Sequence, residues 1–222
     1  MPPRIRLALT VAVTCAAMMV VIVILAAGQG TGNAGGAPLV KTGRFYGATL
    51  PADFPAVDFA LPDQDHHLIR LSDYAGQVVV ATFVYSTCQN VCPIIVQEIA
   101  AAIAELPRRV TALAISVDPK QDTAANVQAF LVKEQVARSI HYLVAPRSVL
   151  APIWAHFGVA PQRIVNSPKS DHSVDLLIFD KSGRPRVGYT DLNTLDPDVI
   201  AADIRTLQAQ PPAASPPRRV QL

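Results

Sequence analysis

The sequence predicts a three-layer α/β sandwich, a central mixed sheet flanked by helices, behind one membrane-spanning helix. Three observations lead to this fold class. The run Val78–Tyr85 is apolar at nearly every position, as in a strand that is covered on both faces. Strand-like runs then alternate with helical patterns, and the alternation ends in a hairpin followed by a helix. An uncharged apolar run over residues 7–27 precedes the domain.

The run 7–27 is long enough to cross a bilayer as a helix. Arg4 and Arg6 precede it and no basic cluster follows at once, so we expect residues 1–6 in the cytoplasm and the remainder outside. A cleaved signal peptide is the alternative, but its apolar core is usually about 7–15 residues long. Cys15 lies in the middle of the run, and we interpret it as a small apolar residue of the span.

Composition divides the rest of the chain into three parts. Residues 28–54 begin with a glycine-rich stretch and are predicted to be a flexible linker. Residues 55–209 form the predicted domain, which is long enough to bury a core. The proline-rich residues 210–222 are predicted to be a disordered tail. A net charge of +2 gives no reason to expect a nucleic-acid partner.

Patterning and caps predict the elements of the domain. In chain order we expect a hairpin of Asp58–Pro62 and Leu68–Leu71, a strand at Val78–Tyr85, a helix from Pro93 to Leu106, a strand at Val110–Val117, a helix over 124–136 capped by Asp122 or Thr123, a strand at Ile140–Val144, a helix at Ser148–Gly158, a hairpin of Asp175–Phe179 and Arg186–Tyr189, and a helix that begins at Asp196-Pro197-Asp198.

Cys88 and Cys92 follow the apolar strand and open the next helix. Unpaired N–H groups and the helix dipole favour thiolates at such a position. A spacing of four residues brings both sulfurs to one side of a helical turn, within reach of a disulfide or of one soft metal ion. The alternative is a pair of buried apolar thiols or a static disulfide. The position after a central strand favours a ligand or redox site.

Thiolates select Cu(I), zinc or iron–sulfur clusters, and the last two need more ligands than two cysteines supply. Two cysteines and one imidazole suit copper in a low-coordinate site. His172 is the candidate imidazole, because it lies in a polar loop before an apolar strand that we expect to pass beside the cysteines. We interpret His141 and His156 as structural. His66 and His67 are interpreted as polar turn residues, with a weak secondary metal role left open.

An ordered set of segments resembles the Sco/SenC family, copper chaperones for the assembly of cytochrome c oxidase. The resemblance covers about residues 55–207 and rests on Phe59–Asp65, Leu71–Gln77, Phe83–Tyr85, Cys88-x-x-x-Cys92-Pro93, Ser116–Pro119 with Asp122-Thr123, Asp171–Ser173 and Leu176–Asp180. It implies a thioredoxin-like fold in which Cys88, Cys92 and His172 bind copper, as Cu(I) or Cu(II).

The resemblance also implies partners. Copper would be delivered to the CuA site in subunit II of cytochrome c oxidase, and thioredoxin-like reductants and other copper carriers are further expected partners. Some relatives act mainly as thiol-disulfide reductases, for which Cys88 and Cys92 would be the redox pair. The family often has Pro-Asp where this chain has Gln89-Asn90, and the loop before His172 carries an extra proline and lysine.

The residues around the cysteines bear on three other functions. A thiol-disulfide oxidoreductase needs the cysteine pair but not His172. A peroxidase of the peroxiredoxin type needs a threonine three residues before its cysteine, where Cys88 has Tyr85 and Cys92 has Gln89. A binding module without chemistry would tolerate serine at both cysteines.

Asp118 is either a residue near the cysteine loop or a simple turn residue. The N-terminus lacks a long Arg/Ser-rich presequence, which favours a bacterial inner membrane with a periplasmic domain.

Overall fold

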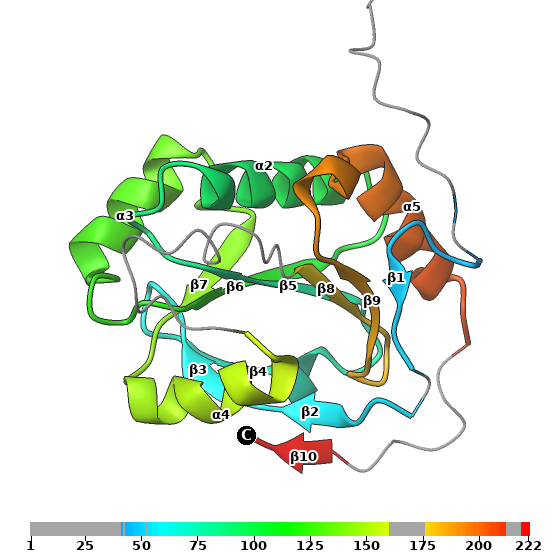
Figure 1. Cartoon of the computed structure of the whole chain (residues 1–222), viewed down its shortest axis with the longest axis horizontal. Coiled ribbons are helices and arrows are strands. Elements are labelled where there is room, and N and C mark those ends of the chain that lie inside the picture. The colour runs from blue at the N-terminus through cyan, green and yellow to red at the C-terminus, as the bar shows by residue number, and fades with distance from the viewer. Residues whose placement is uncertain (1–40, 42, 52, 160–175, 212–218) are drawn as a thin grey trace, which may run out of the picture. The chain divides into compact units, whose positions relative to one another are not determined.

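The centre of the fold is a six-stranded sheet with the order β1-β9-β8-β5-β6-β7, seen in a computed structural model (Figure 1). The structure describes residues 41, 43–51, 53–159, 176–211 and 219–222. The strands of the sheet are β1 (Ala48–Thr49), β5 (Val79–Val84), β6 (Thr111–Ser116), β7 (Ile140–Leu143), β8 (Leu176–Phe179) and β9 (Pro185–Tyr189). β5, β6 and β7 run parallel, whereas β8 pairs antiparallel with both β5 and β9.

Helices cover both faces of this sheet, which confirms the predicted mixed sheet flanked by helices. The helices are α2 (Val91–Ala104), α3 (Ala124–Lys133), α4 (Arg147–Phe157) and α5 (Pro197–Gln208), with short 3₁₀ turns η1 (Leu71–Tyr74) and η2 (Leu192–Thr194). α2, α3 and α5 lie on one face (Figure 1). α4 lies on the other, together with the hairpin of β3 (Ala60–Pro62) and β4 (Leu68–Arg70).

The apolar run at the centre becomes β5, all of whose residues are buried. Successive side chains of a strand point to opposite faces. Val80 and Val84 therefore pack in the cluster under α2, while Val79 and Phe83 pack in the cluster under α4. A strand buried on both faces holds a rigid position, and its carboxyl end is where the chain turns toward the two cysteines.

Local signals set most helix ends. The Asp196 side chain accepts the N–H groups of Asp198 and Val199, so the predicted start of α5 is confirmed. Thr123, not Asp122, caps α3 by accepting the N–H of Asn126. α3 ends at Lys133 rather than near residue 136, because Gln135 takes a left-handed φ of 60° that a helix cannot contain.

Both predicted flanking segments contribute regular structure. Within the predicted linker, β1 pairs with β9 and Phe45 is only 1% exposed. In the predicted tail, β10 (Arg219–Gln221) pairs in parallel with β2 (Ala56–Asp58). None of the helices that the structure describes is long and apolar enough to span a bilayer. The run 7–27 lies outside the described residues, so the predicted span stays a prediction.

Candidate metal centre

The cysteine loop joins the buried strand β5 to helix α2. α2 begins at Val91, earlier than the predicted start at Pro93, so Cys92 lies inside its first turn. Cys88 lies ahead of the N-cap residue Asn90, and its N–H donates to the Tyr85 carbonyl at 3.1 Å, which closes a tight turn. The two cysteines are thus carried by different pieces of structure, one by a loop turn and one by the helix.

The two thiols lie in contact. The N–H of Cys92 donates to Cys88 Sγ at 3.3 Å, so this sulfur receives one of the free N–H groups at the helix N-terminus. Both cysteines are free, and their exposed fractions are 7% and 5%. Burial against the apolar cluster under α2 excludes most water from the pair. The two cysteines are therefore neighbours, as predicted, but Cys88 lies in a loop turn ahead of α2 and not in the helical turn that was expected.

The environment treats the two thiols differently. The pKa of Cys88 is lowered, chiefly because the Cys92 thiol donates a hydrogen bond to it and further because backbone N–H groups of Cys92 and Asn90 point at it. The pKa of Cys92 is raised, because its thiol is the donor, because it is more deeply buried and because the Cys88 charge lies beside it. The pair therefore shares one proton at neutral pH and carries its negative charge on Cys88.

A buried carboxylate stands behind the cysteine loop. Asp122 is 4% exposed, and its two oxygens accept from three residues. Oδ1 accepts from the N–H and the hydroxyl of Ser86 at 2.7 and 2.6 Å. Oδ2 accepts from the Ser116 hydroxyl at 2.5 Å and the Tyr142 hydroxyl at 3.0 Å. Burial raises the pKa of Asp122, although all these hydrogen bonds oppose the shift.

In the sequence, Asp122 is a possible helix cap and part of a segment that resembles the Sco/SenC family, while Asp118 is the acid that the pattern suggests near the cysteine loop. In the structure, the Asp118 carbonyl accepts the N–H groups of Gln121 and Asp122, which is the turn role that was left open. The sequence carries no signal for this role, because either Asp122 or Thr123 could cap α3 and Ser86 lies 36 residues away along the chain.

The predicted third ligand, His172, lies outside the described residues, so its predicted approach to the cysteines stays a prediction. Among the residues described, no histidine or carboxylate completes a three-ligand group with the cysteines. His156 packs edge-on against the rings of Phe54 and Phe157, and burial lowers its pKa, which fits a structural residue.

A second group of possible ligands lies in the β3–β4 turn. Atoms of Asp63, Asp65 and His67 lie within 4.8 Å of one another. The turn itself explains the group, because Asp63 Oδ1 accepts the N–H groups of Asp65 and His67 at 2.9 and 2.8 Å. His141 Nδ1 lies 3.0 Å from the other oxygen of Asp63. These contacts hold the hairpin. Both oxygens of Asp63 already have partners, so neither is free for a metal ion.

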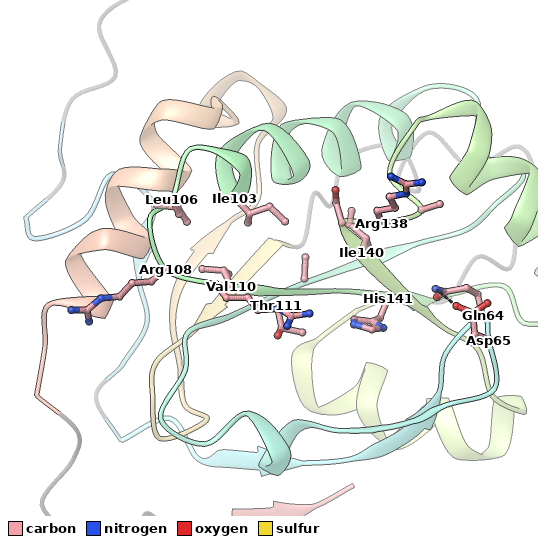
Figure 2. A pocket seen from close by; sticks show the side chains of 14 residues that line it. Gln64, Asp65, Ile103, Leu106, Arg108, Val110, Thr111, Arg138, Ile140 and His141 are labelled. Atoms are coloured by element: carbon pink, nitrogen blue, oxygen red, sulfur yellow. Dashed lines mark hydrogen bonds between the residues drawn. The ribbon is translucent and has the colours of Figure 1, made fainter.

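A cavity of about 360 Å³ lies at the amino ends of β6 and β7 (Figure 2). Arg108, Arg109 and Arg138 are among the residues that line it. Figure 2 shows Arg108 and Arg138 on opposite sides of the cavity, with side chains that do not point toward each other. The cavity contains no thiol, and the ring of its His141 is engaged by Asp63. It is therefore no candidate for a soft metal.

Comparison with known proteins found one family and a set of similar structures. The model of the SCO1/SenC family matches residues 48–209. No curated protein matches the chain. Apo Sco1 from Thermus thermophilus is similar at a TM-score of 0.60 and 26% identity, over 73% of this chain and 96% of that one.

Two further structures share the fold at lower identity. ScoI from Bradyrhizobium japonicum, a structure with copper bound, has a TM-score of 0.58 and 23% identity over 69% of this chain and 99% of that one. BsSco, described as having a disulfide switch and as a member of the Sco family of cytochrome c oxidase assembly proteins, has a TM-score of 0.58 and 18% identity over 74% of this chain and 99% of that one.

Proposed function

The chain belongs to the SCO1/SenC family, and on that premise we propose that it is a membrane-anchored copper chaperone. It binds copper through Cys88, Cys92 and His172 and delivers it to the CuA site in subunit II of cytochrome c oxidase. The observation that carries the proposal is the pair of free, contacting thiols at the N-terminus of α2. The copper-bound relative and the relative from an oxidase-assembly family support it.

The charges of the site favour a monovalent soft cation. Two thiolates and Cu(I) sum to one negative charge, and neutral imidazole from His172 adds none. The N–H groups at the start of α2 face that residual charge. Because the empty pair holds one proton, binding through both sulfurs releases that proton. A three-coordinate ion leaves room for an incoming thiolate of the partner, which can then take over the ion by ligand exchange.

Redox state gates this binding. When Cys88 and Cys92 form a disulfide, the pair loses its one shared proton and two electrons, and an oxidised cysteine pair on a partner is the acceptor of the electrons. The disulfide sulfurs no longer act as thiolate ligands. The reduced chain therefore binds Cu(I) and the oxidised chain does not. Stoichiometric Cu(I) binding with the disulfide intact would contradict this step.

The proposed place of the protein follows from the sequence. Residues 7–27 anchor it once in the inner membrane, with residues 1–6 in the cytoplasm and the folded domain in the periplasm. That is the compartment where the soluble CuA domain of an oxidase would be reached. It is also a compartment in which a disulfide can persist, as redox gating requires.

One observation favours a second candidate function. The pKa values of the two thiols are moved apart, with Cys88 as the stronger nucleophile and Cys92 as the protonated partner, as in thiol-disulfide oxidoreductases. Such an enzyme would reduce the cysteines of the oxidase copper site or of other periplasmic proteins. It would need both cysteines and would be indifferent to His172.

Copper stoichiometry of the reduced full chain in detergent tests the proposal. We expect one Cu(I) per chain, weaker binding in His172→Ala, and none in the Cys88→Ser/Cys92→Ser double variant. His67→Ala is the matched control, because this exposed histidine belongs to the β3–β4 turn. Copper binding that ignores His172, in a chain whose disulfide still cycles readily, would favour the oxidoreductase instead.

A further inference from the structure

Asp122 accepts hydrogen bonds from a residue that lies past the end of the β5–β6 ladder. β5 and β6 are already joined by a parallel ladder whose last pair is Val84 with Ser116. One more backbone bond follows, from the Val117 N–H to the Val84 carbonyl at 2.9 Å. Ser86 lies past this point, and its N–H donates to the Asp122 carboxylate instead of to another strand. The bond to Ser86 thus constrains a residue that the ladder does not hold.

Ser86 occupies the turn that carries the first cysteine. The turn runs from Tyr85 to Cys88 and is closed by their 3.1 Å backbone bond. With both its N–H and its hydroxyl on one carboxylate oxygen, Ser86 is fixed at two points. Cys92, by contrast, is held by its place in the first turn of α2. The position of one sulfur relative to the other therefore depends on two separate supports.

The other side of Asp122 is anchored in the core. Oδ2 accepts the hydroxyls of Ser116 on β6 and Tyr142 on β7, which are both 0% exposed. Burial raises the pKa of Tyr142 well above its usual range, so the phenol stays protonated and donates. A carboxylate supplies acceptors to all four donors at once. Asp122 thus joins a rigid part of the sheet to the cysteine turn.

We propose that Asp122 is a positioning residue for the cysteine pair: its carboxylate fixes the Tyr85–Cys88 turn where Cys88 Sγ accepts the Cys92 N–H and where both sulfurs can share one ion. This inference rests on the proposed function for its copper readout. It does not need copper for its redox readout, because the same placement sets how readily the two sulfurs form a disulfide.

The test compares Asp122→Ala with Asp203→Ala. Asp203 is the matched control, since it is also a buried carboxylate that accepts two backbone N–H groups and a tyrosine hydroxyl, but away from the cysteines. Two quantities are measured on the full chain: the thiol-disulfide equilibrium constant of the pair against glutathione, and the Cu(I) dissociation constant by competition with a chromogenic chelator.

We expect Asp122→Ala to change both constants by about tenfold or more, as loss of a residue that orients metal ligands does. Asp203→Ala should leave both near wild type. Asp122→Asn should return toward wild type, because the amide oxygen can still accept from Ser86 while the amide nitrogen donates to the two hydroxyls. Equal changes in the Asp122→Asn and Asp122→Ala chains would overturn the proposal, since the charge rather than the tether would then act.

Unchanged constants in Asp122→Ala, or equal changes in Asp203→Ala, would also overturn it. If Asp122→Ala does not fold, Ser86→Ala carries the test, because it removes only the hydroxyl bond and leaves the backbone N–H. It should shift both constants in the same direction by a smaller factor, and no shift would count against the proposal. If the wild type binds no Cu(I), the proposed function fails while the glutathione equilibrium still decides the role of Asp122.

Discussion

Two buried aspartates hold two different regions of this molecule by the same chemistry. Asp122 accepts from a serine N–H, two serine hydroxyls and a tyrosine hydroxyl behind the cysteine loop. Asp203 on α5 accepts from the N–H groups of Tyr46 and Gly47 and from the Tyr189 hydroxyl, and so fastens the chain before β1 to the domain. One tether ends at a reactive pair and the other at a strand.

The burial of a carboxylate does not by itself reveal its role. Both groups lie in the core with their oxygens satisfied, as a buried charge requires. What separates them is the segment at the far end of the tether. Loss of Asp203 should be felt in stability alone, whereas loss of Asp122 should also be felt in thiol chemistry.

Removal of the two thiols should have the largest effect, on Cu(I) binding, and would show that the metal site lies at the cysteine loop. Cys88→Ser/Cys92→Ser should lose stoichiometric Cu(I) binding altogether, because serine hydroxyls are poor ligands for a soft ion. Circular dichroism should show a fold like that of the wild type, since the core cluster around the pair is otherwise unchanged. Cys15→Ser is the matched control and should bind like the wild type. Copper retained by the double variant would place the site elsewhere.

Removal of the second tether should have the next largest effect, on stability. Asp203→Ala leaves two backbone N–H groups and the Tyr189 hydroxyl without their acceptor in the core. We expect the free energy of unfolding to fall by about 3 kcal/mol, since a buried donor left unpaired costs about 1–3 kcal/mol. Urea denaturation measures it. Asp191→Ala, at an exposed turn cap, should cost no more than about 1 kcal/mol. An equal loss in both variants would mean that the segment before β1 is not held by Asp203.

Local sequence patterns specify much of the fold, and this is why much of it could be predicted. β5 and β6 follow from continuous apolar runs, the start of α5 from Asp196-Pro197-Asp198, and the place of the cysteines from their position between strand and helix. Each of these signals lies within a few residues of the structure it specifies. The proximity of Cys88 and Cys92 could be predicted from their spacing, although Cys88 lies in a loop turn ahead of α2 and not in the helical turn that the spacing suggested.

What the sequence did not reveal depends on partners that are far away along the chain. Ser86 lies 36 residues before Asp122, and Tyr46 lies 157 residues before Asp203, so no spacing rule connects them. β1 and β10 are two and three residues long and lie in segments that composition marks as linker and tail. They gain order from pairing with β9 and β2, which is a tertiary effect that local propensity does not contain.

Copper affinity should depend on pH because of the proton that the pair shares. The Cys88 pKa is lowered and the Cys92 pKa is raised, so between them the empty site carries one proton that Cu(I) must displace. Affinity should therefore rise with pH by about tenfold per unit, the effect of releasing one proton. Chelator competition from about pH 7 to about pH 8.5 avoids the usual titration range of histidine. A flat profile would mean that the second thiol is already ionised or does not bind.

The smallest effect should come from removing a single tyrosine hydroxyl beside Asp122 or beside Asp203. Tyr142→Phe and Tyr189→Phe each remove one hydroxyl donor from a buried carboxylate that keeps its other donors. Each should lower the free energy of unfolding by about 1 kcal/mol, the usual net worth of one such hydrogen bond. Neither should change the Cu(I) dissociation constant by more than about twofold, because the Ser86 bonds to Asp122 Oδ1 stay in place. A twofold change is about the deviation from additivity that is usual for mutations at independent sites. If Tyr142→Phe weakened copper binding as much as Ser86→Ala, the cysteine turn would be held by the whole network behind it, and the division of Asp122 into a core side and a loop side would be wrong.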